Sequence, residues 1–276
     1  MSRFLRGFLF AFALVCAAGV AAADPVKLDG TVIQGGLIVG HAVQGARVWQ
    51  DGKELRIAPD GRFLVGFAHD APPRSEIKIE ESSGEAVVMP LTVAARQYEV
   101  EKIDNLPPAQ VTPDAATLQR IATERSQVVA VLTRLSDTAM FEHPFAWPVT
   151  GIISGTYGSA RILNGEPRSP HLGVDVAADA GMPILAPTEG VVVLVDDEFF
   201  TGNTVVLDHG YGLTSLYAHL SRVDVKPGDR VARGAQLGLM GKTGRATAPN
   251  LHWGVFLNGV ALDPALLAGP MPQASK

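Results

Sequence analysis

Four of the seven histidines fall within about a third of the chain, in its C-terminal half. The segment of residues 170–175 places His171 four residues before Asp175, which gives a nitrogen ligand followed by an anionic oxygen ligand. In a straight strand these residues would stand about 13 Å apart. Pro170 and Gly173 allow the chain to bend there, so a shared metal requires a curved approach to the strand.

A second candidate segment spans residues 249–253, where strand alternation puts Asn250 and His252 on one side. Together, His171, Asp175 and His252 offer two nitrogens and one oxygen, which suits zinc at about 2.0 to 2.2 Å with a fourth position open for water. In such a site the metal lowers the pKa of its water to about 7 and polarises a substrate carbonyl. His219 is then a candidate general base or oxyanion donor.

Spacing alone leaves two interpretations open, a metal site or structural histidines, because His-x-x-x-Asp is common by chance. The sequence contains no His-Glu-x-x-His helix, which excludes a thermolysin-type site. His209 precedes Gly210 at a turn and is predicted to be structural.

Further short motifs accompany these residues in a consistent order: Trp147-Pro148-Val149, Tyr157-Gly158, Ala186-Pro187-Thr188-Glu189-Gly190, Leu207-Asp208-His209-Gly210, Tyr217-Ala218-His219-Leu220 and Leu251-His252-Trp253. This series, over about residues 145 to 265, resembles the M23 family of peptidoglycan metallopeptidases, also called LytM or lysostaphin-like peptidases. The resemblance implies one zinc ion per chain on His171, Asp175 and His252, with His219 catalytic. It also implies a substrate bond in the stem peptides or cross-links of peptidoglycan.

One position departs from the family pattern, because Asn250 stands where the family has the first histidine of a His-x-His pair. Asparagine cannot shuttle a proton, although its amide can donate a hydrogen bond to a water or an oxyanion. We therefore list Asn250 with His219 as candidate catalytic residues of a zinc endopeptidase. The alternative function is a catalytically weak or inactive relative that binds cell wall or activates other wall hydrolases.

The elements that must position these residues are mainly strands. Residues 24–105 show short strands between turn signals, such as Asp51-Gly52 and Asp60-Gly61, which predict a small β-sandwich. An alternative role for this segment is a carbohydrate- or partner-binding module. Residues 106–142 are predicted to be a helical linker, with Thr112 as N-cap and a helix from 113 to about 136. This helix either connects the two domains or packs wholly on one.

Residues 143–270 are predicted to form the peptidase domain, an antiparallel sheet with strands at 191–195, 204–207 and 214–220. The fold class is thus mainly β, with a sandwich, a linking helix and an M23-like domain. Either the helix or a loop near residues 162–168 could block the site in a latent form.

The N-terminus predicts export. Arg3 and Arg6 precede an apolar run over residues 7–20 and three alanines, which together resemble a signal peptide spanning residues 1–23. The alternative is an uncleaved membrane anchor, but the run barely spans a bilayer. We therefore expect a periplasmic protein without stable membrane insertion.

Cleavage of this segment would remove Cys16, the only cysteine, so that no disulfide could form and stability must come from packed cores or a metal. Without Arg3 and Arg6, 21 Lys and Arg face 28 Asp and Glu, for a net charge of −7. Such an acidic chain is a poor partner for nucleic acid.

Overall fold

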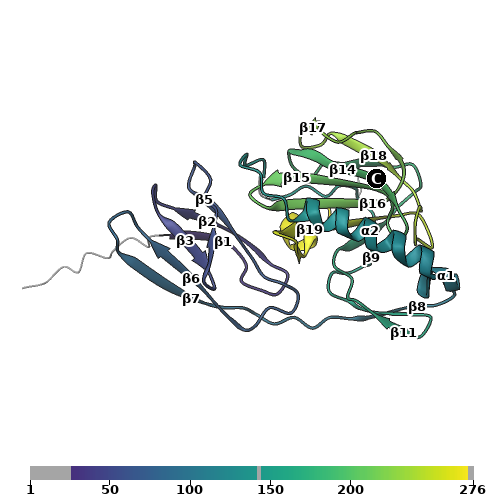
Figure 1. Cartoon of the computed structure of the whole chain (residues 1–276), viewed down its shortest axis with the longest axis horizontal. Coiled ribbons are helices and arrows are strands. Elements are labelled where there is room, and N and C mark those ends of the chain that lie inside the picture. Colours follow the sequence, from purple (N-terminus) through teal and green to yellow (C-terminus); the bar gives the residue numbers. More distant parts are fainter. Residues whose placement is uncertain (1–25, 142–143, 273–276) are drawn as a thin grey trace, which may run out of the picture.

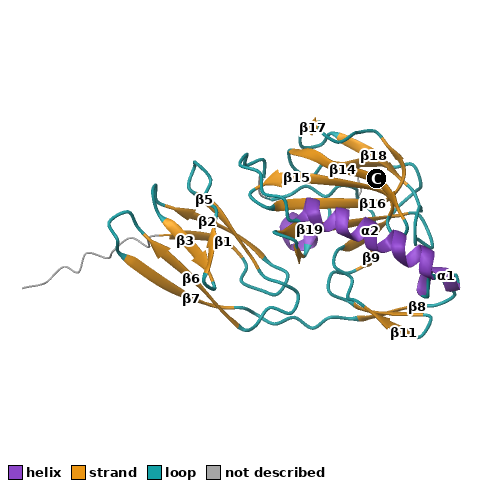
Figure 2. Ribbon diagram, viewed as in Figure 1, coloured by secondary structure: helices purple, strands orange, loops and turns teal. Residues whose placement is uncertain are grey.

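The computed structural model describes residues 26–141 and 144–272 and is mainly β, as predicted (Figures 1 and 2). The predicted signal peptide lies outside the described residues. Among the helices of the described ranges, none has the length and apolar character needed to cross a bilayer.

The N-terminal part is a β-sandwich of two antiparallel sheets. One sheet has the order β1-β2-β5 and the other β4-β3-β6-β7. Side chains from both sheets, among them Val48, Phe63 and Ile77, are fully buried between them. The strands are β1 (Val26–Gly30), β2 (Leu37–Ala42), β3 (Arg47–Gln50), β4 (Lys53–Leu55), β5 (Arg62–Gly66), β6 (Arg74–Glu80) and β7 (Ala86–Thr92).

The next strand, β8 (Val100–Ile103), leaves the sandwich and joins a different sheet. It pairs in parallel with β10 (Ala160–Leu163), which pairs antiparallel with β11 (Glu166–Arg168). Strand β8 lies inside the range predicted for the sandwich, yet its hydrogen-bonded neighbours come from the C-terminal half. The domain boundaries at residues 105 and 142 stay predictions.

Two helices follow, α1 (Pro108–Val111) and α2 (Ala115–Leu132). The predicted N-cap at Thr112 is wrong, because Thr112 caps the end of α1 and its N–H bonds to the Pro108 carbonyl. The side chain of Asp114 instead accepts a 2.8 Å hydrogen bond from the Thr117 N–H and begins α2. Leu132 packs with residues of β15 and β16, so the helix lies on the C-terminal sheet (Figure 1).

The C-terminal part is a large antiparallel sheet with the main order β17-β14-β15-β16-β19-β12-β9. Trp253 and Tyr217, on adjacent strands, are fully buried in its core. Its strands are β9 (Ile152–Gly155), β12 (Val174–Ala177), β13 (Pro183–Leu185), β14 (Gly190–Glu198), β15 (Gly202–Gly210), β16 (Leu213–Val223), β17 (Arg230–Val231), β18 (Gln236–Met240), β19 (Asn250–Leu257) and β20 (Val260–Leu262), before helix α3 (Pro264–Ala268). The three strands predicted here lie within β14, β15 and β16.

Candidate metal centre

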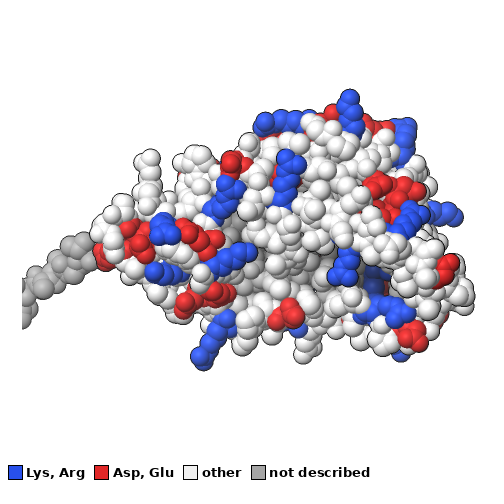
Figure 3. All heavy atoms as spheres, viewed as in Figure 1, with Lys and Arg blue, Asp and Glu red and all other residues white. Residues whose placement is uncertain are grey.

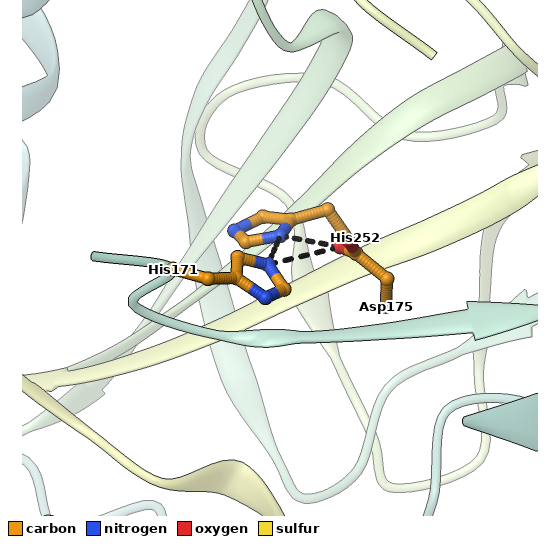
Figure 4. A group of neighbouring side chains, drawn as sticks. All are labelled: His171, Asp175 and His252. Carbon is orange, nitrogen blue, oxygen red and sulfur yellow. Dashed lines mark hydrogen bonds and ion pairs between the residues drawn. The ribbon is translucent and has the colours of Figure 1, made fainter. Parts of the chain in front are cut away.

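Three side chains converge where β12 and β19 run side by side. Asp175 of β12 and His252 of β19 are directly paired across the ladder, and His171 lies in the loop that enters β12. Nδ1 of His252 stands 2.8 Å from Oδ1 of Asp175, and Nε2 of His171 stands 2.9 Å from His252 Nδ1 and 3.1 Å from the same carboxylate oxygen (Figure 4). Two nitrogens and one oxygen thus point at one place.

The chain reaches this arrangement through the bend predicted around Pro170 and Gly173. The backbone of His171 bonds to Ser159 and Gly158, which holds the loop before β12 begins at Val174. A Cβ on Gly173 would lie 2.6 Å from Cε1 of His252. Position 173 therefore needs glycine, because any side chain would occupy the space of the His252 ring.

The donor set fits a metal ion. Nδ1 of His171 lies 3.2 Å from the Thr156 carbonyl, and a proton on that nitrogen leaves the Nε2 lone pair facing the cluster. Zinc ligands at about 2.0 to 2.1 Å from a tetrahedral ion stand about 3.3 Å apart, close to the spacing of these three atoms. Among the described residues, this is the one group of His, Cys, Asp or Glu whose ligand atoms come together in this way.

Charged neighbours hold the carboxylate. Burial alone would raise the pKa of Asp175, but hydrogen bonds and charge from His171 and His252 outweigh burial and lower it far below its usual range. The second oxygen, Oδ2, accepts a 2.9 Å bond from Nη2 of Arg161, whose Nε bonds to Glu101 at 2.9 Å. Asp175 therefore turns one oxygen to the cluster and the other to an arginine.

His219 lies next to the cluster on β16, with its ring centroid 6.3 Å from that of His252. Its backbone has φ +67° at the register shift between β15 and β16, and its N–H bonds to the Thr201 carbonyl. Nδ1 lies 2.8 Å from the Thr243 carbonyl, to which it can donate, which leaves Nε2 as an acceptor. Burial, helped by His252, lowers the pKa of His219 to about 4, so the ring is neutral near pH 7.

Asn250 lines the same pocket as Asp175 and His219. Its Nδ2 donates to the Ala248 carbonyl at 3.2 Å. Its Oδ1 is buried without a hydrogen-bond partner among the described residues. One of the two amide N–H groups is thus used within the loop, and the second is left for the water or oxyanion that we expect it to serve.

His209 stands apart from the cluster, fully buried, with Nδ1 at 2.7 Å from the Glu189 carbonyl and Nε2 at 2.7 Å from Ser215 Oγ. Its contacts are structural, as predicted.

Three residues that line the site were missed by the sequence analysis: Glu101, Arg161 and Arg245. Residues 162–168, predicted as a loop that could block the site, belong mostly to strands β10 and β11. Arg161 and Leu163 of β10 and Ile103 of β8 line the pocket. No motif marks these residues. Glu101 and Arg161 meet at the site because β8 pairs with β10, and the loop of Arg245 is held by bonds to Phe200 and Gln110.

The comparisons with known proteins agree with this geometry. The model of "Peptidase family M23" matches residues 169–264, which include all three converging side chains. Peptidoglycan DD-endopeptidase ShyA of Vibrio cholerae is 42% identical over 107 residues, which are 39% of this chain and 24% of the relative. DD-carboxypeptidase/endopeptidase Mpg of Neisseria meningitidis is 37% identical over 106 residues, 38% of this chain and 24% of the relative.

A solved structure covers more of the chain. The crystal structure of a protein assigned to peptidase M23 from Pseudomonas aeruginosa has a TM-score of 0.66 at 30% identity, over 88% of this chain and 96% of that one. By contrast, the match spans about a quarter of the length of the two curated relatives. The similarity to the solved structure thus includes both halves of the fold, whereas the match to each relative covers less than half of this chain.

Proposed function

This chain belongs to peptidase family M23, and from that membership we propose that it is a zinc-dependent endopeptidase that cleaves cross-links or stem peptides of peptidoglycan in the periplasm. The observation that carries the proposal is the convergence of His171 Nε2, His252 Nδ1 and Asp175 Oδ1 within 3.1 Å of one another. We assign these three residues as the zinc ligands. The ion supplies Lewis-acid chemistry, because it polarises the scissile carbonyl and activates a water molecule.

The chain's own residues supply proton transfer and positioning. His219 is neutral near pH 7, and its Nε2 is left free by the contact of Nδ1 with the Thr243 carbonyl. It can therefore take the proton of the attacking water and return it to the leaving amine. Arg161 donates a hydrogen bond to Oδ2 of Asp175, so Oδ1 is the carboxylate oxygen that would be available to a metal ion.

A second candidate function is supported by Asn250, which replaces a histidine of the family pattern and cannot shuttle a proton. A site with its ligands but without this helper would bind wall peptides and turn them over slowly. The protein would then act as a wall-binding or regulatory relative.

The test measures zinc content and the release of peptides from purified peptidoglycan for the chain without its first 23 residues. We expect one zinc per chain and cleavage in the wild type, and neither in His171→Ala. The exposed His41 of the sandwich provides the control, because His41→Ala should change neither quantity. A wild type without zinc would refute both functions.

The variant Asn250→His separates the two functions. A general acid–base helper contributes about 10² to 10³-fold in rate, so we expect cleavage to rise by up to that factor. An active wild type that this variant accelerates is an enzyme lacking one helper. A zinc-loaded wild type that cleaves nothing until the histidine is restored is the regulatory relative.

A further inference from the structure

A pocket of about 200 Å³ opens beside the three converging side chains. Asp175, His219 and Asn250 line it, together with Arg161 and Arg245. Its volume suits a side chain of a bound peptide better than a single ion. Any molecule cut at the metal centre would pass next to these arginines.

The two arginines differ in how their charge is compensated. Arg161 bonds to carboxylates on both sides, Glu101 and Asp175. Arg245 has no carboxylate within ion-pair distance in the described ranges. Its Nη1 donates to the Gln110 carbonyl at 3.1 Å. Its guanidinium carbon lies 4.3 Å from the centre of the Phe200 ring. The other guanidinium N–H groups of Arg245 make no hydrogen bond with the described residues.

The surroundings make this unpaired charge costly. Arg245 is half-buried, and burial, followed by the like charges of Arg161 and Arg168, lowers its pKa to about 10. Figure 3 shows Lys and Arg side chains, with acidic side chains among them, over the part of the molecule where Figure 1 places β8 and β11. A metal ion in the neighbouring cluster would add further positive charge. An anion is the missing partner.

We propose that Arg245 binds a free carboxylate of the substrate peptide. The pocket is then an anion-binding subsite beside the metal centre. The inference rests on the proposed peptidase function and specifies its substrate as a peptide with a carboxylate close to the scissile bond. A guanidinium suits this role because its N–H groups form a fork that matches the two oxygens of a carboxylate. The contact of the guanidinium with the Phe200 ring and the hydrogen bond to the Gln110 carbonyl fix the orientation of the fork.

The test uses the zinc-loaded chain without its first 23 residues. The ligands are soluble cross-linked peptides released from purified peptidoglycan. Each peptide is prepared with free carboxylates, with only its C-terminal carboxylate amidated, and with all carboxylates amidated. Binding is measured by calorimetry and cleavage by chromatography. The comparison of the two amidated forms shows whether the recognised group is a main-chain or a side-chain carboxylate.

The variants are Arg245→Gln and Arg245→Lys, with Arg233→Gln as the control at an exposed arginine that makes no ion pair among the described residues. A hydrogen bond to a charged group contributes enough that its loss weakens binding of the free peptide about 10- to 100-fold. We expect Arg245→Gln to raise the KM for the free peptide by this factor and Arg245→Lys to raise it less. For the fully amidated peptide, Arg245→Gln should change the KM much less. Zinc content and melting temperature should match the control.

Equal binding of free and fully amidated peptides by the wild type would overturn the inference, even if cleavage upholds the peptidase function. A loss in Arg245→Gln that is the same for all peptides and accompanied by a lower melting temperature would make Arg245 structural and also overturn it. Carboxylate-dependent binding without cleavage would leave the subsite in place and refute the endopeptidase.

Discussion

At the residue scale, the candidate centre depends on which nitrogen of each histidine is free. His171 and His219 each place Nδ1 against a backbone carbonyl, of Thr156 and Thr243 respectively. Both rings therefore keep Nε2 as an acceptor, in one case toward the metal cluster and in the other toward the pocket. If either ring lost its contact with the backbone carbonyl, it could turn. Its Nε2 lone pair would then no longer face the cluster or the pocket.

Gly173 gives a prediction at this scale. Because its Cβ would stand 2.6 Å from the His252 ring, we expect Gly173→Ala to displace that ring and weaken zinc affinity about 10- to 100-fold. Zinc titration against a chromogenic chelator measures the effect. The control is Gly84→Ala in the sandwich, where the φ of +85° strains the backbone but a Cβ would meet no atom within 4 Å; zinc affinity should not change there. An unchanged affinity in Gly173→Ala would show that the loop before β12 can shift without cost.

At the scale of elements, strands β14 to β16 form a rigid support for β19 and the site. His209 of β15 ties this support together through the Glu189 carbonyl and Ser215 Oγ, and its ring packs against Phe145. Burial lowers its pKa to about 4. The neutral ring thus fits the core, whereas protonation of the buried ring is unfavourable.

This burial predicts acid sensitivity. His209 is protonated near pH 6.5 in the unfolded chain but only near pH 4 in the folded one, so the unfolded state binds more protons between these values. Stability is therefore complete above pH 6.5 and falls as the pH drops toward 4, by up to about 3 kcal/mol from this group. We expect His209→Gln to be less stable at pH 7.5 but to show a flatter decline, measured by urea unfolding at several pH values. A decline as steep as that of the wild type would assign the acid sensitivity to other groups.

At the scale of the whole molecule, the sandwich has a core of its own but also contributes side chains to the core of the C-terminal sheet. Leu37 and Leu64 of the sandwich belong to the same buried cluster as Leu257 and Trp253. An ion pair also joins the halves, with Arg96 Nη1 at 2.7 Å from Oδ2 of Asp263, whose side chain is only 4% exposed. The orientation of the halves, and with it the path of β8 to the site, is held by these contacts.

Removal of Arg96 should leave Asp263 buried and unpaired. We expect Arg96→Gln to lower the free energy of unfolding by about 3 kcal/mol, while zinc content is kept. The double variant with Asp263→Asn should cost less than the sum of the two single variants, because it removes the orphaned charge. Urea unfolding measures both, with Arg74→Gln on an exposed strand end as control. Additive effects would mean that the pair does not couple the halves.

The sequence by itself determined the mainly β class, the helix ahead of the C-terminal sheet and the three candidate ligands. These features are local: the bend at Gly173, the alternation around His252 and the helical spacing before Leu132 are all properties of neighbouring residues. The cap of α2 was misplaced by two residues, because Thr112-Pro113 and Asp114 offer competing starts and only the packing of α1 decides between them.

Only the tertiary structure decided what surrounds those ligands. Glu101 and Arg161 meet because β8 pairs with β10, 60 residues further along the chain. Arg245 enters the pocket on a loop held against the Phe200 carbonyl and Gln110. No spacing in the sequence encodes such contacts, because strand pairing and loop packing are chosen by the burial of the whole sheet. The chemistry of the ligands is thus a local property of the chain, whereas the charge that the substrate meets beside them is a property of the fold.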